Sequence, residues 1–181
     1  MNIFALDDDP FISALLMCDQ HINKMIVESC QLLATAHPVG VAPYKHTHFN
    51  HPCAIWVCQS RNNYLWLVQH TFGLLAERKF RWPERKEHKS FAVATWFDQN
   101  VPNNFPSINL TNFAQAMPKH FWRSDPVAAY QIYYLLHKMK FKKSDASWTR
   151  RQKPSWLVIL WNVVMFGYRI FYNNPTRIKN D

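Results

Sequence analysis

The sequence predicts an all-α fold: a compact single domain with a long N-terminal helix and a long central helix. Three observations predict it. Polar side chains recur at three- and four-residue spacing inside apolar runs, Asp-Pro pairs typical of helix starts occur twice, and the period-two alternation of strands is weak throughout. A chain of 181 residues is long enough to bury a core of its own.

The first helix is expected to begin at Asp9-Pro10 and to run, with a bend, to about Ala36, because Asp caps a helix and Pro suits its first position. Pro52 opens the second long helix, which ends at about Arg81. Further helices are expected over 87–99, 126–138 and 156–172, with loops over 37–51 and 101–120.

The apolar run 156–172 is shorter than the roughly 20 apolar residues that cross a membrane. We therefore expect no membrane span and a buried final helix, the alternative being a helix at a membrane surface. Residues 1–155 are expected to form the main helical domain, and residues 156–181 to add an apolar helix and a basic tail.

The amino-acid composition favours some classes of function and argues against others. The net charge of +9 indicates a polyanionic partner, with nucleic acid first and an acidic membrane surface second. Only three glycines are present, and no pair of them forms a phosphate-binding loop, which argues against nucleotide-binding folds. The four cysteines have no CxxC spacing and no secretory signal opens the chain, so we expect a reduced, cytoplasmic protein.

The stretch 18–31 carries the strongest candidate site. Its residues His21, Lys24 and Glu28 are separated by three and four positions and share one helix face. Such a face either lines a reactive cleft or carries a solvent-exposed Lys–Glu pair. A pair of that kind contributes only about a few tenths of a kcal/mol to helix stability. Spacing alone leaves both interpretations open.

A basic segment with interleaved aromatic residues follows in the C-terminal part of the chain. Cations there could neutralise phosphates and aromatic rings could stack on an exposed base, or the cations could be solvated and the rings buried. The candidates for phosphate contacts are Arg61, Lys138, Lys140, Lys142, Arg150 and Arg151, and those for stacking are Trp148 and Trp156.

The stretch 46–53 contains His46, His48, His51 and Cys53, but their spacing does not match a paired zinc-ligand motif. We expect no metal and no cofactor, and we expect His51 to cap the second long helix.

The chain resembles the pyrimidine-dimer DNA glycosylases of the phage endonuclease V type, over about residues 1–125. The resemblance rests on Asp19-Gln20-His21 followed seven residues later by Glu28, on Asn50-His51-Pro52 opening a long helix, and on the opening residues 1–6. A weaker similarity lies at 118–123.

The resemblance implies a compact helical enzyme that removes a damaged base and then cuts the strand. In that family the N-terminal α-amine attacks the anomeric carbon to give a Schiff base, and a carboxylate assists. α-Amines in general titrate near pH 8, so part of such a group is unprotonated in the cell. Carried over, Glu28 is the catalytic carboxylate, the amine belongs to Met1 (or to Asn2 after removal of the initiator), and His21 and His51 support the cleft.

Two positions depart from the family. Val27 and Gln31 stand where the phage enzymes carry arginines. This difference argues against recognition of a pyrimidine dimer more than it argues against glycosylase chemistry. Lys24, one turn before Glu28, is an alternative nucleophile.

The sequence thus predicts a monomeric DNA glycosylase and AP lyase of the DNA-repair type, acting on a damaged or modified pyrimidine in double-stranded DNA. A non-catalytic nucleic-acid-binding protein and a viral DNA-base modification enzyme on the same scaffold are the alternatives.

Overall fold

The computed structural model describes residues 1–142 and 144–172, with side chains of the last helix described as far as Val163, and it confirms the all-α prediction. Within these residues the chain forms α1 (Pro10–Leu16), α2 (Asp19–Ala34), α3 (Pro52–Gln59), α4 (Arg61–Arg81), α5 (Ser90–Gln99), the 3-10 turn η1 (Lys119–Phe121), α6 (Pro126–Tyr133), the π-helical turn η2 (Tyr134–Lys138) and α7 (Ser155–Tyr172).

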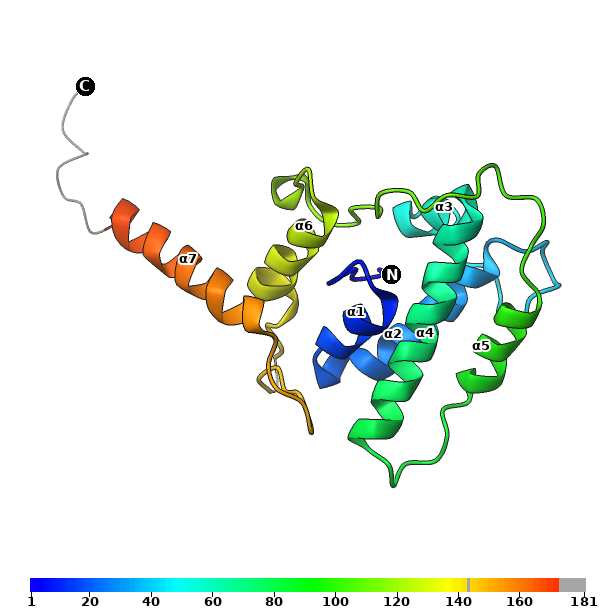
Figure 1. Cartoon of the computed structure of the whole chain (residues 1–181), viewed down its shortest axis with the longest axis horizontal. Coiled ribbons are helices and arrows are strands. Elements are labelled where there is room, and N and C mark those ends of the chain that lie inside the picture. Colours follow the sequence, from blue (N-terminus) through cyan, green and yellow to red (C-terminus); the bar gives the residue numbers. More distant parts are fainter. Residues whose placement is uncertain (143, 173–181) are drawn as a thin grey trace.

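Helix α4 is the centre of the fold, and α1, α2, α3 and α5 all pack against it (Figure 1). Its apolar face joins that of α2, where Ile22, Met25 and Ile26 are fully buried. Gly73 allows α1 to approach closely, because a Cβ at this position would lie 2.9 Å from the Cβ of Ala14. The residues that precede α1 are themselves buried in the core.

Both long helices predicted from the sequence are divided in two. The first stops at Met17, which is extended (φ −69°, ψ 144°), and restarts after Cys18. The second is interrupted at Ser60, also extended (φ −153°, ψ 145°), whose hydroxyl accepts hydrogen bonds from the N–H groups of Asn62 and Asn63 and donates to the Asn109 carbonyl. A side chain that caps a new helix competes with continuation of the old one, so the prediction of one helix over 52–81 was wrong.

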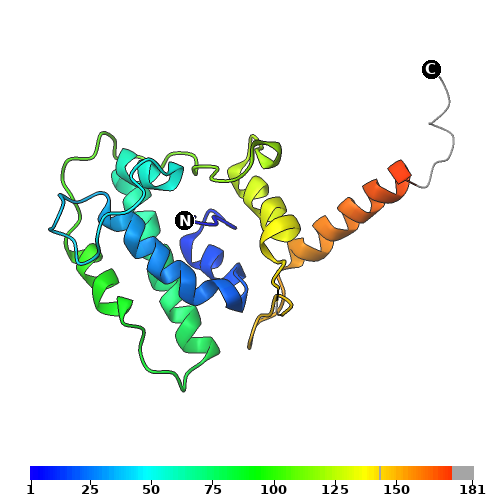
Figure 2. The same cartoon turned by 180° about the vertical axis from the view of Figure 1, so that it is seen from behind.

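The predicted caps are confirmed. The Asp9 carboxylate accepts hydrogen bonds from the N–H groups of Phe11 and Ile12, and Asp125 accepts one from Val127. Of the predicted irregular connection 101–120, residues 101–118 are irregular and the last two belong to η1. The N–H of Arg61 donates to the carbonyl of Ser107 in this connection. The chain then reaches α6, which lies beside the N-terminal segment in both views (Figures 1 and 2).

A buried ionic network fastens the segment 147–151 to the helical body. The Arg81 guanidinium lies 2.9 Å from Asp19 and 3.0 Å from Glu77 and also donates to the carbonyls of Leu15 and Met17. Burial alone would raise the pKa of Asp19, but hydrogen bonds from Arg81 and Thr149 outweigh it and lower that pKa.

Helix α7 extends away from the rest of the molecule (Figures 1 and 2). Leu157 is buried, whereas several apolar side chains are more than half exposed, namely Val158, Ile159, Trp161 and Val163. The prediction of a buried final helix was therefore wrong for this part of α7. The predicted basic tail, 173–181, lies outside the described residues. No helix among the described residues has the length and apolar character needed to cross a membrane.

Candidate active site

The N-terminal segment runs through the interior of the protein. Ile3, Ala5 and Leu6 are fully buried and Phe4 is 3% exposed. The Asn2 side chain fixes the start of the segment: its Oδ1 accepts hydrogen bonds from the N–H groups of Ile3 (2.8 Å) and Phe4 (3.0 Å), and its Nδ2 donates to the Ala116 carbonyl at 2.8 Å. Phe4 has a φ of 42°, a conformation that bulky residues adopt only when their surroundings impose it. The chain end is thus held in one position.

Met1 is anchored by its side chain and accessible at its main chain. The side chain is 4% exposed and its sulfur lies 4.0 Å from the hydroxyl of Thr47, whereas the residue as a whole is only half-buried. The exposure that Met1 retains therefore belongs to its main chain, which carries the α-amine.

Glu28 lies directly beside this amine. Its Oε2 is 3.9 Å from the Met1 nitrogen and accepts a hydrogen bond from the N–H of Asn2 at 3.1 Å. Its Oε1 is 3.3 Å from the Nζ of Lys24. The Glu28 side chain is 14% exposed and that of Lys24 is 62% exposed. One carboxylate thus contacts two amines, one fixed by the fold and one on an exposed, flexible side chain.

His51 belongs to the same group of residues. As predicted, it caps α3, and its Nδ1 accepts a hydrogen bond from the N–H of Cys53 at 3.2 Å. Burial, followed by the positive charges of the N-terminus and of His48, lowers the pKa of His51, although Glu28 opposes this. Since Nδ1 accepts this hydrogen bond, the neutral imidazole carries its proton on Nε2 and is a hydrogen-bond donor at that atom. We call Met1, Lys24, Glu28 and His51 the amine cluster.

His21 does not lie on the open face expected for it. It is 5% exposed, its Nδ1 is 2.6 Å from the hydroxyl of Tyr134, and its ring packs against Phe4 and Phe141. Burial, followed by the charges of Lys24 and Lys138, lowers the pKa of His21 to about 4. Its position is that of a neutral core residue beside the cluster.

The predicted DNA contacts divide into two groups. In the first group the side chains reach solvent, and their contact with DNA phosphates stays a prediction: Arg61, Lys138, Lys140, Lys142 and Arg150. In the second group, Arg151 binds Glu77 through two nitrogens, at 2.6 and 3.1 Å, and its guanidinium lies 4.0 Å from the ring centre of Phe80. Trp148 is 7% exposed and its N–H donates to the Leu16 carbonyl.

These positions correct two expectations. Trp148 is a core residue and Arg151 is already paired, so neither enters the proposed DNA interface. Trp156 is half-buried, and its N–H has no hydrogen-bond partner among the described residues.

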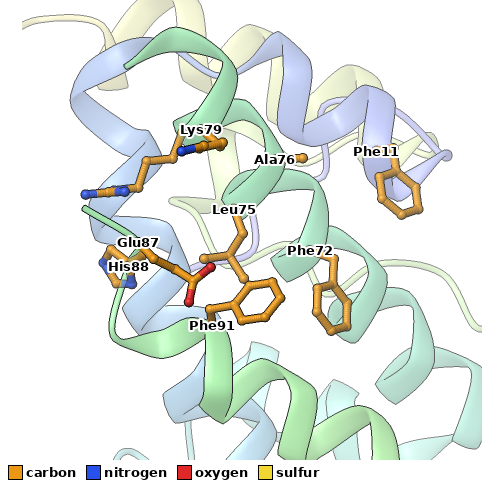
Figure 3. A pocket seen from close by; sticks show the side chains of 9 residues that line it. Phe11, Phe72, Leu75, Ala76, Lys79, Glu87, His88 and Phe91 are labelled. Atoms are coloured by element: carbon orange, nitrogen blue, oxygen red, sulfur yellow. The ribbon is translucent and has the colours of Figure 1, made fainter. Parts of the chain in front are cut away.

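A separate hollow of about 440 Å³ lies between α1, α4 and α5. Phe11, Phe72 and Phe91 line its apolar wall, with Glu87 and His88 on one side (Figure 3). Arg78 also borders it, but its guanidinium donates to Asn23 and to the Lys86 carbonyl. Since no residue of the amine cluster lines this hollow, the candidate chemistry lies elsewhere.

In the described part of the chain, no group of three or more His, Cys, Asp or Glu side chains is arranged to hold a metal ion. The four cysteines are free thiols. Residues 46–53, considered above for zinc, contribute the His51 cap and no such ligand group.

No protein-family model, curated protein or solved structure matches this chain. The arrangement of the chain's own residues is therefore what indicates a function, and the amine cluster is the part of that arrangement with the clearest chemistry.

Proposed function

We propose that the protein is a DNA glycosylase with AP-lyase activity that excises a damaged or modified pyrimidine through a Schiff base on its N-terminal amine. One observation carries the proposal: the Met1 nitrogen lies 3.9 Å from Glu28, although Glu28 comes 26 positions after Asn2 in the chain. The buried segment 3–6 is what holds the two groups together.

The chemistry requires an unprotonated amine at a fixed position. The amine lone pair attacks C1′, the glycosidic bond breaks, and the base leaves with the bonding electrons and takes up a proton. Opening of the sugar ring gives the imine. Removal of a C2′ proton then expels the 3′ phosphate by β-elimination, and water hydrolyses the imine to release the enzyme.

The residues of the amine cluster suit these steps. Glu28 can take the proton that the attacking amine loses and can stabilise the cationic sugar. His51, neutral with its proton on Nε2, can donate a hydrogen bond within the cluster but is not a second base. The anchored Met1 side chain limits the freedom of the amine, which favours attack by proximity. Lys24 remains the alternative nucleophile, but its exposed side chain must be ordered first.

The test is reductive trapping with borohydride on duplex DNA that carries an abasic site. The wild-type protein should form a stable adduct, and Glu28→Gln should reduce the rate of trapping by about 100-fold or more, because an amide neither takes the proton nor balances the charge. Binding to the same duplex should be nearly unchanged in this variant. Glu84→Gln, which alters an exposed carboxylate in the loop after α4, is the matched control.

Trapping by Glu28→Gln at the wild-type rate would contradict the proposal. Tight, salt-dependent DNA binding without any adduct would instead indicate a non-catalytic nucleic-acid-binding protein. An adduct formed only on unmodified or hypermodified bases would indicate a base-modification enzyme.

A further inference from the structure

Aromatic rings from η1, from the last residue of α6 and from η2 form a continuous row. Tyr133 and His137 are stacked with ring centres 5.3 Å apart, Phe121 contacts Tyr133 at 5.0 Å, and His120 contacts Phe121 at 4.2 Å. Phe121 and Tyr133 are buried to 8% and 6% exposure, whereas His120 and His137 are exposed. The buried rings of Phe121 and Tyr133 therefore pack against the two exposed imidazoles.

An exposed indole lies next to this row. Trp122 is 48% exposed, and its N–H donates to the Met117 carbonyl at 3.0 Å, which fixes the direction of the ring. Arg123 donates to the carbonyls of His120 and Trp122 and thereby stiffens the same turn. A fixed, solvent-facing indole is a suitable platform for a stacked base.

Most charged side chains of this region are positive. Between Asp98 and Asp145 the sequence contains six lysines and arginines and a single acidic residue, Asp125. Asp125 already accepts the hydrogen bond that caps α6. The ammonium of Lys138 lies 5.2 Å from the ring centre of Tyr133, which places a cation beside the aromatic row.

The π-helical turn η2 connects this region to the amine cluster. The N–H of Met139 donates to the Tyr134 carbonyl, five residues back. The Tyr134 hydroxyl contacts His21 at 2.6 Å, so the turn is fixed to α2. Lys24 and Lys138 both lie close enough to His21 for their charges to act on its imidazole, and Lys24 contacts Glu28. π-Turns are frequent at functional sites.

We propose that a DNA strand leading to the amine cluster binds along this region, with Lys138 and Arg123 contacting phosphates and Trp122 stacking on an unpaired base. We call the residues 119–123, Tyr133, His137 and Lys138 the strand-binding surface. The inference rests on the proposed function, for which an exposed nucleotide must be held outside the base stack. It places the main contacts around α6, whereas the sequence alone pointed to 138–156.

The experiment measures fluorescence anisotropy of labelled duplex DNA that contains a tetrahydrofuran abasic analogue. This analogue cannot form an imine, so binding is observed without chemistry. Lys138→Gln should lower the slope of log Kd against log salt by about 0.9, the value for one lost phosphate contact. Lys138→Arg should restore the slope.

Trp122→Ala should weaken binding by roughly tenfold or more and leave the salt slope unchanged, because stacking involves no counterion. The matched controls are Lys86→Gln, an exposed lysine on the loop after α4, and Trp161→Ala, an exposed indole on α7. Neither control should change Kd. Unaltered thermal unfolding of each variant shows that the fold is retained.

Wild-type affinity and salt slope in both Lys138→Gln and Trp122→Ala would overturn the inference, as would equal losses in the two controls. Tighter binding to RNA of the same sequence than to DNA would overturn the choice of DNA. Losses in both variants combined with no borohydride adduct on abasic DNA would support the surface and contradict the proposed glycosylase, so the two failures are distinguishable.

Discussion

Two histidines buried in the neutral form should make the protein sensitive to mild acid. His70 on α4 is fully buried, its ring is stacked on Trp66, and neither ring nitrogen has a hydrogen-bond partner among the residues that the structure describes. Burial lowers the pKa of His70 from 6.5 to about 3. For His21, burial and the charges of Lys24 and Lys138 lower the pKa to about 4.

The direction of these pKa shifts determines how the free energy of unfolding changes with pH. Below pH 6.5 the unfolded chain binds protons on both imidazoles and the folded protein does not, so the free energy of unfolding falls as the pH falls, down to the folded-state pKa. Well below pH 6.5 each histidine changes it by about 1.4 kcal/mol per pH unit, and integration gives about 2 kcal/mol each and about 4 kcal/mol together between pH 7 and pH 5. Total stabilities of about 5–15 kcal/mol are typical, so the effect is large.

The assay is urea unfolding at pH 7 and at pH 5, followed by circular dichroism. His70→Leu removes one buried imidazole, and its loss of stability between the two pH values should be about 2 kcal/mol smaller than that of the wild type. Any constant change caused by the leucine cancels in this difference. His120→Leu, which alters an exposed histidine, should behave as the wild type. A His70→Leu variant with the wild-type pH dependence would show that the buried imidazole of His70 is not a cause of the acid sensitivity.

Two further predictions concern the packing around α4. Arg81→Met should lower the free energy of unfolding by about 3–5 kcal/mol, because Asp19 and Glu77 lose their buried partner; a urea titration that gives less than about 1 kcal/mol would contradict the importance of this network. Gly73→Ala should destabilise the protein by about 1–3 kcal/mol despite the better helix propensity of alanine, because the new Cβ meets Ala14 at 2.9 Å. Gln69→Ala, exposed on the same helix, is the control, and a thermal shift upward for Gly73→Ala would contradict the close approach of α1.

Local signals in the sequence predicted the helices and their starts. Asp9, His51 and Asp125 cap the helices that follow them because a cap depends on residues within one turn. The breaks were harder to predict. Ser60 is a good cap residue inside a long helical pattern, and hydrogen bonds to the distant region 107–109 stabilise its extended conformation. Residues so far apart in the chain give no local signal.

The same limit applied to the candidate site. Spacing brought Lys24 and Glu28 to one helix face, but the position of Met1 depends on the buried path of residues 3–6 and on the contact between Asn2 and Ala116. The basic segment was misjudged for a related reason. Sequence does not tell which cations already have partners, and here Glu77 binds Arg151 while the core takes up Trp148.

Mapping of the trapped adduct decides whether the amine held beside Glu28 is the nucleophile that we propose. The protein would be reduced with borohydride on abasic DNA, digested with nuclease and protease, and its peptides analysed by mass spectrometry. We expect the sugar-derived mass on the α-amine of the N-terminal peptide, with Met1 retained. An adduct on Lys24, or an N-terminal peptide that stays unmodified while an adduct forms elsewhere, would contradict it.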